Sequence, residues 1–203
     1  MQMQSMLAAA ALLAAGIQPG IAQAQEDSRW LVRTTAITVL ADASSDVLDL
    51  SVDDQTTLAI DATYFATPTL GINVLAAFMQ PEVKSGVAGP LGSVGLVPPI
   101  VTAQLHLGRA QSAFRPYVGA GFNYNIFHGG SGQLEALDVD VDDSIGFVLQ
   151  IGANYHINDN VSINADIRYL RFNADVTVGA NPALNDKLEF EGFILGAGLG
   201  FWL

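Results

Sequence analysis

The sequence predicts an all-β chain that folds as an eight-stranded antiparallel up-and-down transmembrane β-barrel. Three observations support this prediction. The last segment alternates between apolar and small residues, seven earlier segments alternate in the same way, and the connections between segments are short and long in turn. Half of the 203 residues are hydrophobic and only 14% are charged. Outside the N-terminus, however, there is no apolar run of about 18 residues that would form a transmembrane helix.

The last segment, residues 193–203, carries the clearest signal. Its odd-numbered positions are all apolar, and its even-numbered positions include Gly196, Gly198 and Gly200. Because successive side chains point to opposite faces of a strand, this segment has one continuous apolar face and one nearly bare face. The apolar face suits contact with lipid, and the glycines leave space inside a barrel.

The other segments follow in chain order. We expect strands at 29–40, 56–65, 70–80, 100–107, 114–127, 144–156, 161–174 and 188–203. Short connections at 66–69, 108–113 and 157–160 alternate with long ones at 41–55, 81–99, 128–143 and 175–187. An even number of strands joined in this way is typical of a bacterial outer-membrane barrel with short periplasmic turns. The pattern therefore predicts that both termini lie in the periplasm.

The outward face of most strands can be assigned from the alternation. Apolar side chains occupy every second position in five of the inner segments: Leu58, Ile60, Ala62 and Tyr64; Leu70, Ile72, Val74, Ala76 and Phe78; Val118, Ala120, Phe122, Tyr124 and Ile126; Ile145, Phe147, Leu149, Ile151, Ala153 and Tyr155; and Val161, Ile163, Ala165, Ile167 and Tyr169. The opposite positions in each segment are expected to face the lumen.

The N-terminus resembles a secretory signal peptide. Residues 6–16 form a short apolar core, and Ala22-Gln23-Ala24 is a small-x-small cleavage site. We therefore expect residues 1–24 to be the signal peptide and residues 25–203 to be the outer-membrane β-barrel.

Composition excludes several classes of function. The formal net charge is −12 and Lys and Arg total only 8, so the chain lacks the basic surface that nucleic-acid binding requires. No nucleophile and base stand in a recognisable pattern, and we expect neither enzymatic activity nor a cofactor. The three histidines lie in separate segments without metal-ligand spacing. The acidic stretch 138–143 lacks the glycine and the closing glutamate of a calcium loop, so it is interpreted as a solvated loop and no metal site is expected.

Two stretches resemble the outer-membrane protein W (OmpW/AlkL) family. They are residues 96–104, LVPPIVTAQ, and residues 114–124, FRPYVGAGFNY. Residues 63–67, 71–74 and 143–144 also fit, and the resemblance covers the whole expected mature chain in order. It implies an eight-stranded outer-membrane barrel without enzymatic activity. Members of this family are linked to the passage of small hydrophobic molecules.

Charged residues at lumen positions form one candidate site. Arg33, Asp61, Arg115, Asp166 and Arg168 have the inward parity and are expected to pair as a buried network. Two interpretations stay open. The network is either a structural plug, or a polar floor that blocks straight passage through a barrel that is just wide enough for one small ligand.

Apolar residues at lumen positions form a second candidate site. Ile37, Val39, Leu75, Met79 and Val148 are expected to form an apolar upper pocket that binds a hydrophobic guest. The alternative is ordinary packing of the lumen.

Prolines mark a third candidate feature. Pro98 and Pro99 open the fourth strand and Pro116 lies early in the fifth, and proline removes donors from a strand ladder. They either end loops or form a weak lateral seam through which an apolar molecule leaves into lipid.

These expectations combine into one function with one alternative. The chain is expected to admit small hydrophobic molecules and release them laterally into the membrane. The alternative is a structural or receptor-type barrel with a plugged lumen. The expected partners are outer-membrane lipid and lipopolysaccharide, small hydrophobic solutes and the barrel-assembly machinery.

Overall fold

The structure, a computed structural model, describes residues 29–45, 49–86, 89–109, 112–179 and 185–203. The expected signal peptide lies outside the described residues. The elements are β1 (Trp30–Ser44), β2 (Leu50–Val52), β3 (Gln55–Phe65), β4 (Leu70–Ala77), β5 (Glu82–Ser85), β6 (Gly89–Val97), β7 (Ile100–His106), β8 (Phe114–Gly130), α2 (Gln133–Ala136), β9 (Val139–Val141), β10 (Ser144–His156), β11 (Val161–Val178) and β12 (Asp186–Trp202). Among these residues, no helix is long and apolar enough to cross a membrane.

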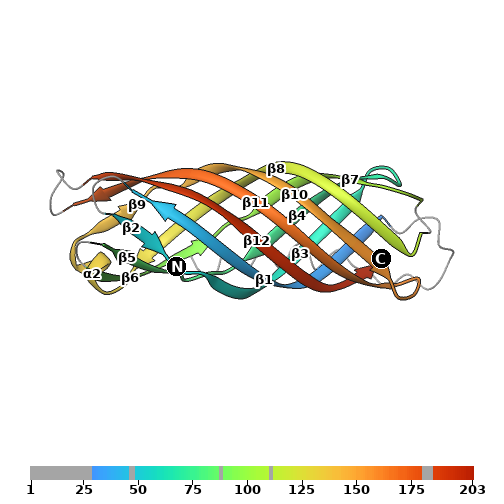
Figure 1. Cartoon of the computed structure of the whole chain (residues 1–203), viewed down its shortest axis with the longest axis horizontal. Coiled ribbons are helices and arrows are strands. Elements are labelled where there is room, and N and C mark those ends of the chain that lie inside the picture. The colour runs from blue at the N-terminus through green and yellow to red at the C-terminus, as the bar shows by residue number, and fades with distance from the viewer. Residues whose placement is uncertain (1–28, 46–48, 87–88, 110–111, 180–184) are drawn as a thin grey trace.

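Eight of the strands form a closed antiparallel ring, which confirms the predicted fold class. The ring follows the order β1, β3, β4, β7, β8, β10, β11 and β12, and β12 pairs with β1 to close it. The closing ladder runs from Leu31 opposite Trp202 to Ser44 opposite Glu189. Beyond it, Trp30 and Leu203 exchange backbone hydrogen bonds of 3.3 and 2.9 Å. Figure 1 shows the strongly tilted strands of this ring.

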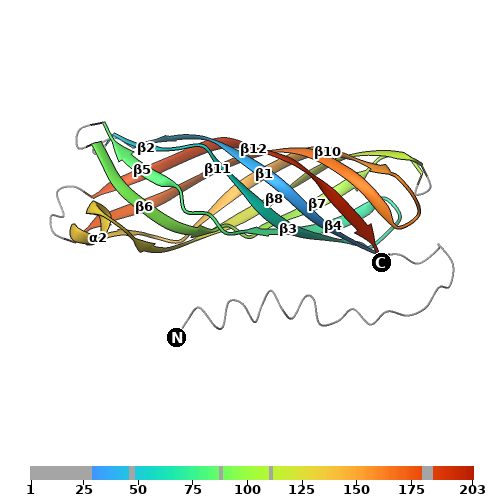
Figure 2. The same cartoon turned by 90° about the horizontal axis from the view of Figure 1, so that it is seen from below.

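The two ends of the barrel differ. The end at which Trp30 meets Leu203, here called the termini end, carries the short connections. The opposite end, here called the long-loop end, carries β2, β5, β6, β9 and α2 (Figures 1 and 2). There β6 pairs with the upper part of β8, and β9 pairs with the end of β11. The long connections expected from the sequence are therefore partly strand, because the alternation of apolar and polar residues continues past the barrel wall.

The two faces of each ring strand follow the predicted alternation. Leu149 and Ile151 of β10 point outward and are 45% and 60% exposed, whereas Gln150 between them points inward and is 1% exposed. On β12 the outward residues alternate with Gly196, Gly198 and Gly200, as expected. A broad apolar surface thus surrounds the ring, and the polar side chains of the wall face the lumen.

Candidate functional site

The lumen is built in layers, and an aromatic cluster of Phe65, His106, His156 and Trp202 fills the termini end. The Trp202 ring stacks on Phe65 and on His156, with centroids 5.2 and 5.0 Å apart. The guanidinium of Arg115 lies over the rings of Phe65 and Trp202, and its Nη2 donates to the backbone oxygen of Pro68 at 2.6 Å. Arg115 therefore packs in this cluster, and it pairs with no carboxylate of the described residues. This corrects the expectation that it joins the charged network.

The next layer is polar and centres on a buried ion pair between Arg33 and Asp61. Asp61 Oδ1 accepts from Arg33 Nε at 2.6 Å, and the Arg33 Nη2–Asp61 Oδ1 distance is also 2.6 Å. The same carboxylate accepts from Asn73 Nδ2 at 2.8 Å and from Thr35 Oγ1 at 3.3 Å. Arg33 is completely buried and Asp61 is 2% exposed. Because a buried charge is costly unless it is paired and hydrogen-bonded, each of these groups depends on the other.

A second buried ion pair, on β11, lies in the same layer and joins the first. Asp166 Oδ2 lies 2.8 Å from Arg168 Nη2, and it accepts from Gln150 Nε2 at 2.9 Å and from the Tyr117 hydroxyl at 3.1 Å. The Tyr117 hydroxyl also accepts from Arg33 Nη1 at 3.3 Å, so it links the two ion pairs. The polar layer is defined here as Arg33, Asp61, Tyr117, Gln150, Asp166 and Arg168. All six side chains are at most 5% exposed, so they occupy the lumen at this height.

Glycines in the wall give this layer its space. A Cβ at Gly152 would lie 2.6 Å from the Tyr117 hydroxyl, and a Cβ at Gly196 would lie 2.7 Å from Asp166 Oδ1. Real Cβ atoms do not approach other atoms so closely, so these two positions exclude larger residues. The lumen space beside the glycines of the last strand is therefore occupied by polar side chains from the neighbouring strands.

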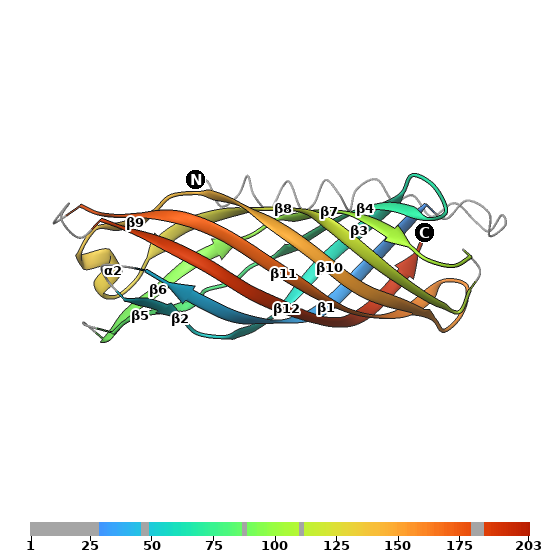
Figure 3. The same ribbon diagram turned by 45° about the horizontal axis from the view of Figure 1, so that its top comes forward.

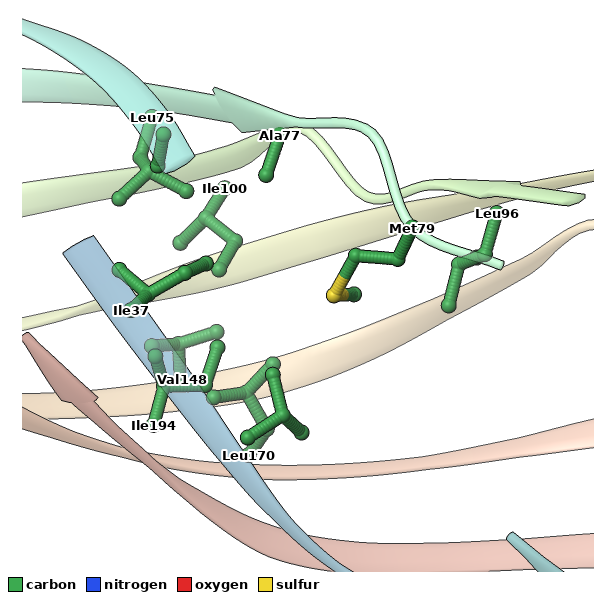
Figure 4. Close-up of a cluster of buried hydrophobic side chains, with 11 residues drawn as sticks. Ile37, Leu75, Ala77, Met79, Leu96, Ile100, Val148, Leu170 and Ile194 are labelled. Atoms are coloured by element: carbon green, nitrogen blue, oxygen red, sulfur yellow. The ribbon is translucent and has the colours of Figure 1, made fainter. Parts of the chain in front are cut away.

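Toward the long-loop end, the inward face changes from polar to apolar in a single step on several strands. Asn73 is followed by Leu75 on β4, Thr102 by Ile100 on β7, Gln150 by Val148 on β10 and Arg168 by Leu170 on β11. Ile37, Ala59, Leu75, Ile100 and Val148, at 1% exposure or less, form the apolar layer. Figure 4 shows Ile37, Leu75, Ile100 and Val148 pointing toward one another, with Met79 and Leu96 farther along the lumen.

A cavity of about 710 Å³ lies above the apolar layer, that is, on its side toward the long-loop end. Its lower wall carries apolar side chains from six strands or their flanking residues: Val39, Met79, Leu96, Phe127, Leu170, Phe172, Phe190 and Ile194. The rings of Phe172 and Phe190 stack with centroids 4.7 Å apart, and Phe127 lies 6.4 Å from Phe172. The volume lies within the usual range for pockets that bind small organic molecules.

The five residues expected to bind a hydrophobic guest are brought into one buried cluster, but at two heights. Val39 and Met79 line the cavity, whereas Ile37, Leu75 and Val148 belong to the apolar layer beneath it. The aromatic wall of the cavity was not expected from the sequence. Its signal was present, because Leu170 and Phe172 alternate with exposed residues within the predicted seventh strand, and Val176 and Val178 continue the alternation beyond its predicted end at residue 174.

A cap of apolar side chains covers the cavity at the long-loop end. Leu134 of α2 is 6% exposed and packs with Leu50, Leu91, Val176 and Leu188 in a second apolar cluster. Figure 3 shows α2 at this end of the barrel, beside the β5–β6 hairpin. These five side chains also line the cavity. The cap therefore packs the long connections against the cavity.

One of the three candidate prolines, Pro98, lies where the wall is incomplete. The register pairs Leu75 with Ile100, and Met79 pairs with Leu96 through two backbone hydrogen bonds. Continuing the register between these two pairs places Ala77 opposite Pro98, which has no N–H to donate. The β4–β7 ladder is therefore interrupted at Pro98, and this proline also lines the cavity.

The other two prolines differ from the expectation of one seam. Pro99 faces β8, where its oxygen still accepts from Tyr124 N at 3.0 Å. Pro116 lies at the termini end, and its oxygen accepts from Leu107 N at 2.8 Å. Positions 99 and 107 are eight residues apart along the strand, roughly 26 Å at the usual rise, so Pro116 belongs to a different part of the wall.

Comparison with known proteins identifies the family. The model of the OmpW family matches residues 27–203. The chain belongs to the OmpW family.

The relatives agree with the fold and with the location. Outer membrane protein W of Escherichia coli is 31% identical over 198 residues, which cover 91% of each chain. Outer membrane protein AlkL of Ectopseudomonas oleovorans is 28% identical over 160 residues, 75% of this chain and 68% of AlkL. The crystal structure of OprG from Pseudomonas aeruginosa superposes with a TM-score of 0.71 at 25% identity, covering 86% of this chain and 95% of OprG. The chain is therefore an outer-membrane β-barrel.

Within this OmpW-family barrel, the titratable side chains outside the ion pairs do not gather as a metal centre. The described residues contain no group of three or more His, Asp or Glu side chains placed to hold a metal ion. His106 and His156 lie in the aromatic cluster, and His128 lies against Phe78 with ring centroids 5.8 Å apart. The chemistry that the lumen offers is apolar contact above and paired charge below.

Proposed function

We propose that this barrel admits small hydrophobic molecules into the cavity from the long-loop end and releases them laterally into the outer membrane. The long-loop end then faces the cell exterior and both termini face the periplasm. The proposal requires no chemical step, and it includes no enzymatic activity. Its partners are outer-membrane lipid and lipopolysaccharide, the barrel-assembly machinery and the solutes themselves.

The observation that carries the proposal is the position of the apolar cavity directly above a lumen that is filled. An apolar solute in the cavity contacts Met79, Leu96 and Phe172. To continue toward the termini end, it has to displace the apolar layer and then separate the ion pairs of Arg33 with Asp61 and of Arg168 with Asp166. Separating buried, hydrogen-bonded charges costs several kcal/mol, so the axial route is unfavourable.

The lateral route is supported by the interruption at Pro98. A closed barrel wall is held by its ladder hydrogen bonds, and the β4–β7 ladder loses a donor where Ala77 faces Pro98. Because Pro98 also lines the cavity, the weakest described part of this ladder lies beside the bound solute. On the outer surface, Phe78 is 52% exposed and continues the apolar face toward lipid.

Admission through the cavity is tested by Met79→Gln. Met79 is 6% exposed and lines the cavity, so a polar amide there removes apolar contact with the solute without touching the ring ladder. We expect uptake of an apolar fluorophore into liposomes to fall about fivefold, because loss of ~40 Å² of apolar contact costs about 1 kcal/mol. Met79→Leu keeps the contact and should retain uptake. Unchanged uptake in a well-folded Met79→Gln protein would favour the structural or receptor-type barrel with a plugged lumen.

Lateral release is tested by a disulfide at the interruption. The chain has no cysteine, and Ala77 and Pro98 stand opposite each other in register, where strand Cα atoms are about 5.5 Å apart and a disulfide is allowed. Cysteine at position 98 also restores the missing N–H, so the open reference is the wild-type protein. We expect oxidised A77C/P98C to deliver the fluorophore to the bilayer several-fold more slowly than the wild-type barrel. Delivery by the oxidised variant at the wild-type rate would contradict the lateral route and leave the cavity as a binding site only.

A further inference from the structure

The cavity has an uneven distribution of charge. Its lining includes the carboxylates of Asp53, Glu135, Asp138 and Asp140, but no Lys or Arg side chain. All eight Lys and Arg residues of the sequence fall within the described residues, and none of them lines the cavity. His128 is the one histidine among the described lining residues. These four carboxylates come from the connections at the long-loop end, whereas the lower wall of the cavity is apolar.

Three of these carboxylates have no counter-ion. Asp53 pairs with Lys84, at a distance of 2.5 Å between Nζ and Oδ2, and hydrogen bonding to Asp53 raises the pKa of that lysine. Glu135, Asp138 and Asp140 form no ion pair among the described residues. The backbone holds two of them in place: Asp138 donates its N–H to Glu135 O at 3.2 Å, and its own oxygen accepts from Gly179 N at 3.0 Å. The negative charge is therefore fixed at the cavity and not neutralised there.

A second polar group of the lining also favours positive charge in a guest. The Oε1 atom of Gln55 is buried and has no hydrogen-bond partner. It is an acceptor, and a guest that brings a cationic or hydrogen-bond-donating group satisfies it. A guest that brings a carboxylate adds another acceptor to a site that already has several.

We propose that the cavity selects its guests by charge: it takes lipophilic cations and neutral apolar molecules and rejects lipophilic anions such as long-chain carboxylates. Glu135, Asp138 and Asp140 are the residues that set this selectivity. The inference rests on the proposed function, because it assigns a substrate class to the same cavity. The apolar wall of Phe127, Phe172 and Phe190 binds the body of the guest, and the three carboxylates act on its charged group.

Elementary electrostatics gives the direction and the scale. Three like charges at the rim of a cavity repel an anion and attract a cation, and apolar walls screen this interaction less than bulk water does. We expect a cation to bind at least about tenfold more tightly than an anion of the same shape at low ionic strength. Added salt should reduce that ratio, because exposed charges are screened over about 10 Å at 0.1 M.

The test uses two ions of nearly the same shape and opposite charge. Tetraphenylphosphonium and tetraphenylborate are titrated against the full barrel in zwitterionic nanodiscs, and each displaces the neutral fluorophore N-phenyl-1-naphthylamine. Empty nanodiscs give the background from partitioning into lipid. We expect the fluorophore to bind, the phosphonium to displace it, and the borate to displace it at least tenfold less well.

Matched variants separate the local effect from net charge. E135Q/D138N/D140N removes three charges from the cavity lining, and it keeps side-chain size and the positive φ of 52° at position 138, which asparagine tolerates. D42N/E189Q/E191Q removes three charges from the exposed face of β1 and β12, away from the lining. The first variant should bind both ions with nearly equal affinity, and the second should keep the wild-type preference.

The outcomes distinguish failure of the proposed function from failure of charge selection. If the neutral fluorophore does not bind to the wild-type barrel, the proposed function itself fails. If the fluorophore binds but the two ions displace it equally, charge selection fails and apolar admission stands. Equal loss of preference in both variants would assign the effect to net charge, which also overturns the role of Glu135, Asp138 and Asp140.

Discussion

Asp61→Ala is expected to destabilise the barrel by about 3–5 kcal/mol, the usual cost of removing one partner from a buried ion pair. Arg33 is completely buried, and Asp61 is the carboxylate that contacts it. Without that carboxylate, the guanidinium stays in the lumen as an uncompensated charge, and Asn73 and Thr35 lose their shared acceptor. Urea unfolding in lipid vesicles, followed by the fluorescence of the two tryptophans and by heat-dependent gel mobility, measures the loss.

The double variant R33M/D61A is the matched control. Replacing both members of a buried ion pair by apolar side chains is often close to neutral. We therefore expect the double variant to recover most of the stability that Asp61→Ala loses. A loss of less than about 1 kcal/mol in the single variant would show that Arg33 finds water or another partner in the lumen, and the polar layer would not be the tightly packed floor described above.

Leu149→Arg should be the most damaging single change on the outer surface, at about 2–4 kcal/mol. Leu149 lies near the middle of the outward apolar run from Ile145 to Tyr155, and it is 45% exposed on the face that meets lipid. An arginine there places a charge at mid-bilayer depth. The same vesicle unfolding experiment gives its cost.

Asn173→Arg is the control for added charge on the same face of the wall. Asn173 is exposed on β11, two residues beyond Arg171, and it pairs in register with Glu189. A charge near the membrane interface costs about 0–1 kcal/mol, so this variant should assemble normally. Equal losses in the two variants would mean that Leu149 does not lie at mid-bilayer depth. Gln150 would be a poor control, because its side chain binds Asp166 and accepts from Thr102 and Gln104 within the polar layer.

The faces of the strands could be predicted from the sequence because they depend only on the two-residue period of a strand. Leu149 faces outward and Gln150 inward for this reason, and the same rule places Arg33, Asp61 and Asp166 in the lumen. The change from Asn73 to Leu75 on β4 can be read equally directly. Local alternation thus predicts which residues share a face.

Height in the barrel could not be predicted in the same way, because it depends on the stagger between neighbouring strands. Strand tilt and stagger are properties of the closed ring, and they determine which residues of different strands meet. Sequence parity gave Leu75, Met79 and Val148 the same inward direction but not the same height, and only Met79 reaches the cavity. For the same reason Arg115 has the predicted direction but other partners, and Pro116 lies too far along the wall to belong to the predicted seam.

The ladder between β1 and β12 sets the order in which this molecule can fold. It joins the first and last strands of the ring, so the contact that closes the ring spans nearly the whole chain. Contacts of such long sequence separation form slowly, because a large loss of chain entropy precedes them. Until they form, β1 and β12 each present an unpaired edge, and such edges invite pairing with other chains. Because the chain is synthesised from its N-terminus, one edge of β1 stays unpaired until β12 is available. The chain needs protection from aggregation throughout that interval.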